Sequence, residues 1–179
     1  VRSHGFSTDL VVQQPAGGQC VVADSGEDVY RRSLYVIWKR TVPHPTLGTF
    51  DVPNRDECTV RRQKTNTPLQ ALVLMNDPAF VEAARILGTQ ITNAGDKDQA
   101  IAEVFTHLSG RPPVEEEINL LKQVRKNELD TFSQHPNKAS GWLRAGNAPV
   151  DPKLDPNEVA ADAVLASVII NSDAVITKR

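Results

Sequence analysis

The chain has 179 residues, of which 40% are hydrophobic and 23% are charged, and its formal net charge at pH 7 is −2. This length is enough for one domain with a buried core, and the composition excludes a chain that is disordered throughout. No apolar run approaches the roughly 20 residues that a membrane-spanning helix needs, so we expect no membrane span.

The first 25 residues combine Gly, Ser and Gln with two Val–Val pairs, at 11–12 and 21–22. This pattern is typical of two short extended pieces around a turn, or of a loosely held arm. Residues 34–38, Leu-Tyr-Val-Ile-Trp, fit a helix or a strand by periodicity, and their β-branched and aromatic content favours the strand. We therefore predict a small extended or β part at the N-terminal end.

A long loop is predicted to follow this part. Pro43, Pro45, Gly48 and Pro53 interrupt the chain, so residues 42–62 are expected to form an ordered loop without regular structure. Loops of this length in compact domains are usually functional or packed on themselves.

Five helices are predicted beyond residue 66, so the expected fold is mainly α. They cover residues 68–75, 78–92, 96–109, 113–132 and 156–170. Thr67, Asp77 and Asp155 each precede a proline, and each is expected to cap a helix that begins at that proline. The first helix is apolar on nearly all sides, which predicts the central buried helix. Residues 134–153 are rich in Pro, Gly and Asn and indicate a linker or long loop.

Several motifs of the chain resemble those of a known family. They are Tyr30-Arg-Arg-Ser-Leu-Tyr35, Trp38-Lys-Arg-Thr41, Cys58-Thr-Val-Arg-Arg62, Thr65-Asn-Thr-Pro-Leu-Gln-Ala-Leu72 and Asn76-Asp-Pro78. With them the chain, from about residue 26 to its end, resembles a planctomycete-specific C-terminal domain of unknown function, the PSD domain found downstream of cytochrome c modules.

The resemblance has implications for domains and location. It implies a divergent N-terminal arm, residues 1–25, followed by a single mostly helical domain, residues 26–179. It also implies a secreted, extracytoplasmic protein that contacts upstream domains of its own chain. Haem c is implied only in those upstream modules.

Cofactor and metal sites are not expected in this chain. Attachment of haem c needs Cys-x-x-Cys-His, which neither Cys20 nor Cys58 provides. The two cysteines leave two alternatives open, a disulfide between them or a reduced and buried Cys58. The four histidines are too scattered to indicate a ligand set; they are His4, His44, His107 and His135.

Eight of the 20 basic residues lie in about one fifth of the chain. From Arg31 to Lys64 there are eight Lys or Arg against three acidic residues. Doublets of Lys or Arg here flank aromatic residues, which gives as candidate ligand-binding residues Arg31, Arg32, Tyr35, Trp38, Lys39, Arg40, Arg61 and Arg62. Guanidinium groups and stacking rings of this kind bind sulfated or carboxylated glycans, or an acidic redox partner. The alternative is that these arginines are internal and pair with helix C-termini. Because the whole chain is acidic, nucleic acid is not an expected partner.

Four residues of the predicted loop are weak catalytic candidates, namely Asp51, Asp56, Glu57 and His44. Two carboxylates in unlike environments would fit glycoside cleavage. The favoured interpretation is that the acids pair with Arg55, Arg61 and Arg62 and pin the loop. We therefore predict a non-enzymatic ligand- or partner-binding module. The alternative is part of a catalytic domain that acts on polysaccharide, by hydrolysis or oxidation.

Overall fold

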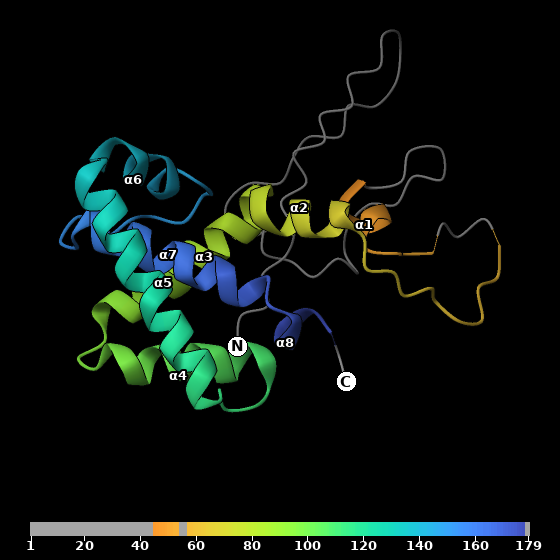
Figure 1. Ribbon diagram of the computed structural model, residues 1–179. Coiled ribbons are helices and arrows are strands. Elements are labelled where there is room, and N and C mark those ends of the chain that lie inside the picture. The colour runs from red at the N-terminus through yellow and green to blue at the C-terminus, as the bar shows by residue number, and fades with distance from the viewer. Residues whose placement is uncertain (1–44, 54–56, 178–179) are drawn as a thin grey trace, which may run out of the picture. The chain divides into compact units, whose positions relative to one another are not determined.

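The protein is mainly helical in the computed structural model, which describes residues 45–53 and 57–177. The described residues form helices α1 (Pro45–Thr49), α2 (Pro68–Asn76), α3 (Pro78–Asn93), α4 (Lys97–Ser109), α5 (Glu115–Gln134), α6 (Pro136–Leu143), α7 (Pro156–Ile170) and α8 (Asp173–Ile176), and they contain no strand (Figure 1). The predicted extended part and the predicted arm lie outside these residues. Two compact units divide between Val73 and Leu74, within α2; we call residues 1–73 the first unit and residues 74–179 the second unit.

The five helices expected from the sequence are all present, and the three predicted proline-preceding caps are confirmed. Asp77 accepts a hydrogen bond from the Ala79 amide at 2.9 Å, and Asp155 accepts one from the Asn157 amide at 3.0 Å. Thr67 and Gln70 form a reciprocal capping box at the start of α2. In each case the helix begins at the following proline. Proline has no backbone N–H, so it leaves no donor unpaired in the first turn.

Three short helices were not expected. Residues 42–62 were predicted to lack regular structure, yet α1 begins at Pro45, and α6 begins at Pro136 inside the predicted linker. Proline is disfavoured inside a helix but is compatible with the first turn. A proline can therefore begin a helix as well as interrupt one. The third short helix, α8, follows α7 after a two-residue turn.

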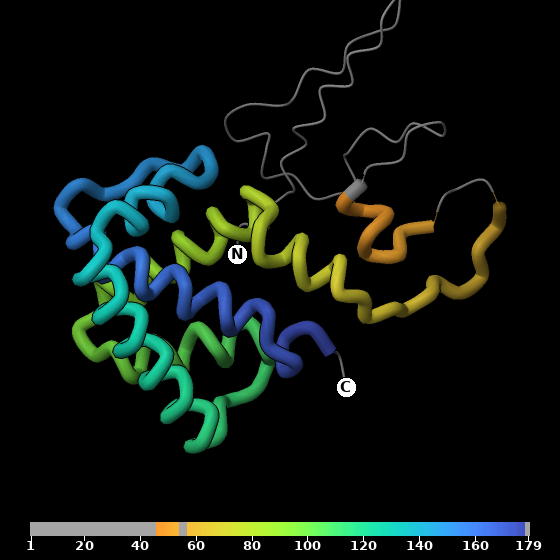
Figure 2. The backbone as a smooth tube through the Cα atoms, turned by 45° about the horizontal axis from the view of Figure 1, so that its top comes forward, coloured from red at the N-terminus to blue at the C-terminus, as the bar shows by residue number. Residues whose placement is uncertain are grey.

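Helix α7 is the central element of the second unit. It packs against α3, α4, α5, α6 and α8 (Figure 2). Its buried residues are Val159, Ala160, Ala161, Asp162, Ala163, Leu165, Ala166 and Ile169. Half of these side chains are alanine methyl groups, which let neighbouring helices approach closely on several sides.

The contact of α3 with α7 is the closest of these approaches. A Cβ atom added at Gly88 of α3 would lie 2.5 Å from the backbone nitrogen of Ala163 and 2.7 Å from the carbonyl carbon of Asp162. Real Cβ atoms do not approach backbone atoms so closely. Only glycine therefore fits at position 88 while the two helices keep this distance.

The main hydrophobic core joins four helices of the second unit. Ile91, Ile101, Phe105, Leu121 and Leu165 are buried together, with Ala100, Val104 and Ile169 completing the cluster. Val168 of α7, in contrast, is 42% exposed. A second, smaller cluster contains Phe132, Ala139, Ala160 and Ala161.

The prediction that residues 68–75 form the central buried helix is wrong. Leu69, Leu72 and Met75 of α2 are 55%, 53% and 48% exposed, and the buried residue of α2 is Gln70. A helix that is apolar all round satisfies a necessary condition for burial, but neighbours must also surround it. Helix α7 meets both conditions, and its small residues allow the neighbours to pack closely.

Candidate functional site

Residues 57–67, which we call the basic segment, are all exposed and carry three cationic side chains, Arg61, Arg62 and Lys64. Glu57 is the acidic residue of this segment. Among the described residues, neither Arg61 nor Lys64 has a hydrogen-bond or ion-pair partner.

The basic segment is held at one point by Asp51. The Asp51 carboxylate accepts hydrogen bonds from the Thr65 amide at 2.8 Å and from the Thr65 hydroxyl at 2.7 Å. The Gln70 side-chain amide donates to the Thr49 carbonyl at 2.8 Å and to the Thr65 hydroxyl at 3.0 Å. Because the Thr65 side chain donates a hydrogen bond to the ionised form, the pKa of Asp51 lies below its usual value. A group with a lowered pKa is ionised at neutral pH and is poorly suited to act as a general acid.

Asp51 also has an unusual backbone conformation. Its φ angle is 59°, in the left-handed region, and it follows the C-terminal end of α1. The Val52 amide donates to the Leu47 carbonyl at 3.1 Å across this turn. Aspartate is one of the few residues other than glycine that enter this region, because its short side chain can form local hydrogen bonds.

Arg62 ties the basic segment to the same turn. Its Nε donates to the Asp51 carbonyl oxygen at 2.9 Å, and its Nη2 donates to the Phe50 carbonyl oxygen. The loop was expected to be pinned by pairs between arginines and carboxylates. At Asp51 the contacts differ from this expectation: Thr65 and Gln70 bind the carboxylate, while Arg62 binds backbone carbonyl groups and adds a favourable charge nearby.

The other predicted site residues divide into two groups. Glu57 and Arg61 are exposed and are not part of the Asp51 network. Outside the described residues lie Arg31, Arg32, Tyr35, Trp38, Lys39, Arg40, His44, Arg55 and Asp56. Cys58 is a free, exposed thiol, so the alternative of a buried Cys58 is wrong; Cys20 lies outside the described residues.

The second unit contains a pocket of about 870 Å³ that the sequence did not indicate. It lies among α4, α5, α7 and α8, and its lining includes Phe105, Leu108, Leu120, Leu121, Val168, Ile169 and Val175 together with polar residues. These residues are far apart in the sequence, and each one alone has the pattern of an ordinary core position. No signal of the sequence therefore distinguished the pocket from the core.

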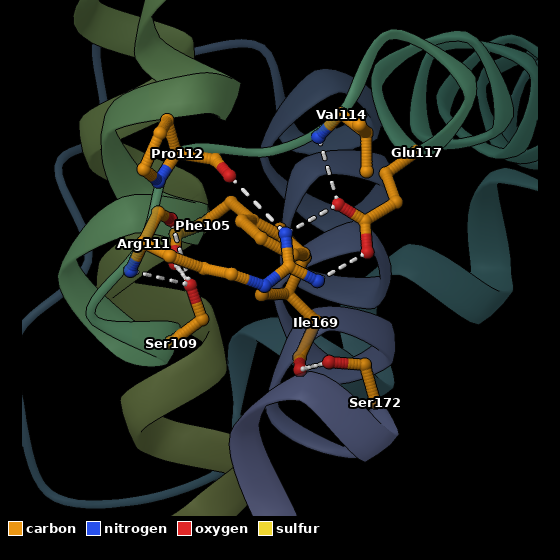
Figure 3. A network of polar contacts seen from close by, with 8 residues as sticks. All are labelled: Phe105, Ser109, Arg111, Pro112, Val114, Glu117, Ile169 and Ser172. Carbon is orange, nitrogen blue, oxygen red and sulfur yellow. Dashed lines mark hydrogen bonds and ion pairs between the residues drawn. The ribbon is translucent and has the colours of Figure 1, made fainter. Parts of the chain in front are cut away.

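The polar side of the pocket is a network of contacts around Arg111 (Figure 3). Arg111 donates to both carboxylate oxygens of Glu117, at 2.9 and 2.6 Å, and its guanidinium lies 5.2 Å from the centre of the Phe105 ring. Glu117 also accepts from the Val114 amide at 2.9 Å, as a capping residue of α5. The bond from Arg111, followed by the one from Val114, lowers the pKa of Glu117 to about 2.

In the described part of the chain, no three His, Cys, Asp or Glu residues gather into a potential metal site. No helix in that part has both the length and the apolar content needed to cross a membrane.

Comparison with protein families matches residues 5–125 to PSD1, a protein of unknown function (DUF1553). The match covers more than half of the chain. The chain belongs to the PSD1 family. The PSD1 match includes the basic segment, the Asp51 network and both members of the Arg111–Glu117 pair, and it ends within α5. No curated protein and no solved structure matches this PSD1 chain.

Proposed function

We propose that the chain is a non-enzymatic binding module that recognises an anionic ligand, a sulfated or carboxylated glycan, through the basic segment. The observation that carries this proposal is the state of Arg61 and Lys64. Both are exposed and have no partner among the described residues, while their segment is fixed by neighbouring contacts.

The arrangement of charge supports an anionic ligand. Three cations fall within four residues, and two of them are not neutralised inside the described chain. Arg62 uses two of its donor nitrogen atoms for backbone carbonyls, and its Nη1 remains available for a ligand. Guanidinium groups bind sulfate and carboxylate groups through pairs of parallel hydrogen bonds.

Fixing the segment before the ligand arrives favours binding. A loop that becomes ordered only on binding loses conformational entropy, which weakens the affinity. Here Asp51, Thr65 and Arg62 order the backbone on both sides of Lys64 in the free protein. The remaining entropy loss is that of the exposed ends of the side chains.

We also propose that this module belongs to an exported, cytochrome-associated protein and has upstream domains of the same chain as neighbours. The family resemblance of the sequence motifs supports this setting. In that setting the predicted residues of the segment 31–40 would extend the same anionic site. An acidic redox partner is the competing ligand, and the experiment separates the two.

The experiment measures binding of the full chain to heparin fragments and to oligogalacturonate by calorimetry at several salt concentrations. Changing Arg61→Gln together with Lys64→Gln is expected to weaken binding about tenfold or more, because bonds to charged groups are lost. Affinity of the unchanged chain should fall with salt, since exposed charges are screened over about 8 Å at physiological ionic strength.

A matched control changes Lys126→Gln and Lys153→Gln, two exposed lysines of the second unit, which alters net charge equally. If this control weakens binding as much, the effect is one of total charge and the proposed site is wrong. If no glycan binds while an acidic cytochrome does, in a manner that depends on Arg61 and Lys64, the ligand class is wrong.

A further inference from the structure

We propose that the pocket of the second unit is a docking site for a basic amphipathic helix of a partner protein. This site lies in a different unit from the basic segment and does not depend on the function proposed above. Three observations carry it: exposed apolar residues around the pocket, polar groups that already have hydrogen-bond partners, and carboxylates without an ion pair on the first turn of α5, whose residues Glu117, Leu120 and Leu121 line the pocket.

The apolar residues form a surface that a second helix can cover. Phe105, Leu121 and Ile169 at the base of the pocket are buried, whereas Leu120 of α5 and Val168 of α7 are 63% and 42% exposed. Val114 and Ile176 are 59% and 41% exposed, and they add exposed apolar area on the neighbouring turns. Large apolar side chains gathered around a concave site are typical of interaction surfaces.

The polar groups of the pocket offer few hydrogen bonds to a ligand. Arg111 and Glu117 bind each other through two bonds, and Glu117 also binds the Val114 amide. The Ser109 hydroxyl lies within hydrogen-bond distance of the Phe105 carbonyl, at 2.8 Å, and the Ser172 hydroxyl donates to the Ile169 carbonyl at 2.7 Å. A polar ligand would lose its hydration without recovering these bonds, so an apolar occupant is favoured.

Charge determines which apolar occupant fits. Glu115 and Glu116 are exposed on the first turn of α5 and have no ion pair among the described residues. Glu116 lies one helical turn before Leu120, on the same face. These carboxylates oppose a fatty acid or an anionic membrane surface and attract cationic groups. A helix with leucines at i, i+3 and i+7 and lysines beside them meets both requirements.

The probe is a synthetic 18-residue helical peptide of leucine and lysine, labelled with a fluorophore, and a second peptide in which every lysine is glutamate. Binding to the full chain is followed by fluorescence anisotropy. We expect the basic peptide to bind and the acidic peptide to bind at least about tenfold more weakly. Methyl resonances of Leu120, Val168 and Val175 should shift during the titration.

Two variants test the surface without disturbing the core, because the residues changed are exposed. Leu120→Gln should weaken binding about tenfold, and Glu115→Gln with Glu116→Gln should weaken it several-fold and reduce its salt dependence. Val150→Gln is the control, since Val150 is 40% exposed but does not line the pocket. It should leave binding unchanged.

Several outcomes would overturn the proposal. Equal binding of both peptides, or binding that Leu120→Gln leaves intact, would show that the pocket does not select a basic helix. Sedimentation velocity provides a further check. If the chain forms dimers that Leu120→Gln dissociates, the occupant is a second copy of this chain, and the proposed partner is wrong.

Discussion

At the scale of single residues, Asp51 combines two roles that normally require different residues. Its backbone adopts the left-handed conformation after α1, and its carboxylate holds Thr65. Glycine would suit the first role and cannot perform the second. From the sequence, Asp51 is a candidate for catalysis and for ion pairing, because neither a turn conformation nor a threonine partner is visible in a pattern of charges.

The Asp51 network gives a prediction about the order of the basic segment. Asp51→Gly should accelerate hydrogen exchange of the Thr65 amide, because this amide loses its acceptor. Asp51→Ala should do the same and should also destabilise the turn, because alanine is strained at a positive φ. Exchange of the Val52 amide, which donates across the turn, should be faster in Asp51→Ala than in Asp51→Gly and so distinguishes the two variants by NMR. Exchange unchanged in both would show that the carboxylate does not order the segment.

The Glu117 carboxylate gives a prediction about pH. Its pKa of about 2 in the folded chain is below its ordinary value of 4.5, so its contribution to stability is present above pH 4.5. That contribution is lost as the pH falls from 4.5 through about 2. Glu117→Gln should therefore lower the free energy of unfolding at pH 7, and the difference from the unchanged chain should shrink in acid.

Urea unfolding at pH 7, 4 and 2.5 measures this difference. Glu116→Gln is the matched control, since Glu116 is exposed on the same helical turn and has no ion pair among the described residues. It should have little effect on the free energy of unfolding. A Glu117→Gln effect that remains constant with pH would mean that packing or capping, not charge, is responsible.

At the scale of helices, the contact of α3 with α7 depends on a glycine. Gly88→Ala should destabilise the second unit by about 1–3 kcal/mol, because the added methyl group meets the backbone of α7. Gly141→Ala in α6 is the control, since a Cβ there would meet nothing within 4 Å. That change should stabilise by up to about 1 kcal/mol through helix propensity. Thermal unfolding of both variants tests the opposite signs.

A buried ion pair joins α5 to α7. Asp162 is fully buried and accepts from Arg125 at 2.6 Å and from the Thr92 hydroxyl of α3 at 2.9 Å. Arg125→Gln should cost about 3 kcal/mol or more, because it leaves a buried carboxylate without its counter-charge. Lys122 lies on the same helix as Arg125 and forms an exposed pair with Asp98 of α4; Lys122→Gln removes this pair and should cost about 0–1 kcal/mol. Equal costs, measured by urea unfolding, would contradict the difference in burial.

The helices could be predicted from the sequence to the extent that their determinants are local. Capping by Asp77 and Asp155 depends on residues two or three positions away, and both helix starts were predicted correctly. Burial depends on partners distant in the sequence. That is why α2 was wrongly expected at the centre and why the pocket beside Leu120 was missed. The close contact of α3 with α7 at Gly88 was missed for the same reason, since Ala163 is 75 positions away.

At the scale of the whole molecule, the buried hydrophobic residues of the described chain lie in the second unit, with the exception of Leu47. A fragment of residues 77–179 should therefore remain helical by circular dichroism and unfold cooperatively. It should also lose heparin binding, because the basic segment is removed. A fragment that is unfolded would show that residues before 77 are needed to complete the core.

The close contact between α3 and α7 also determines which second mutations can compensate for a larger residue at position 88. A side chain that is too large in a core can often be compensated by a smaller residue opposite it. At Gly88 the atoms that an added methyl group would meet are the nitrogen and Cα of Ala163 and the carbonyl carbon of Asp162, which every residue possesses. Removing the methyl group of Ala163 would leave these backbone atoms in place. A screen for second-site suppressors of Gly88→Ala should therefore recover changes that shift a whole helix or stabilise the unit elsewhere, and none at position 163.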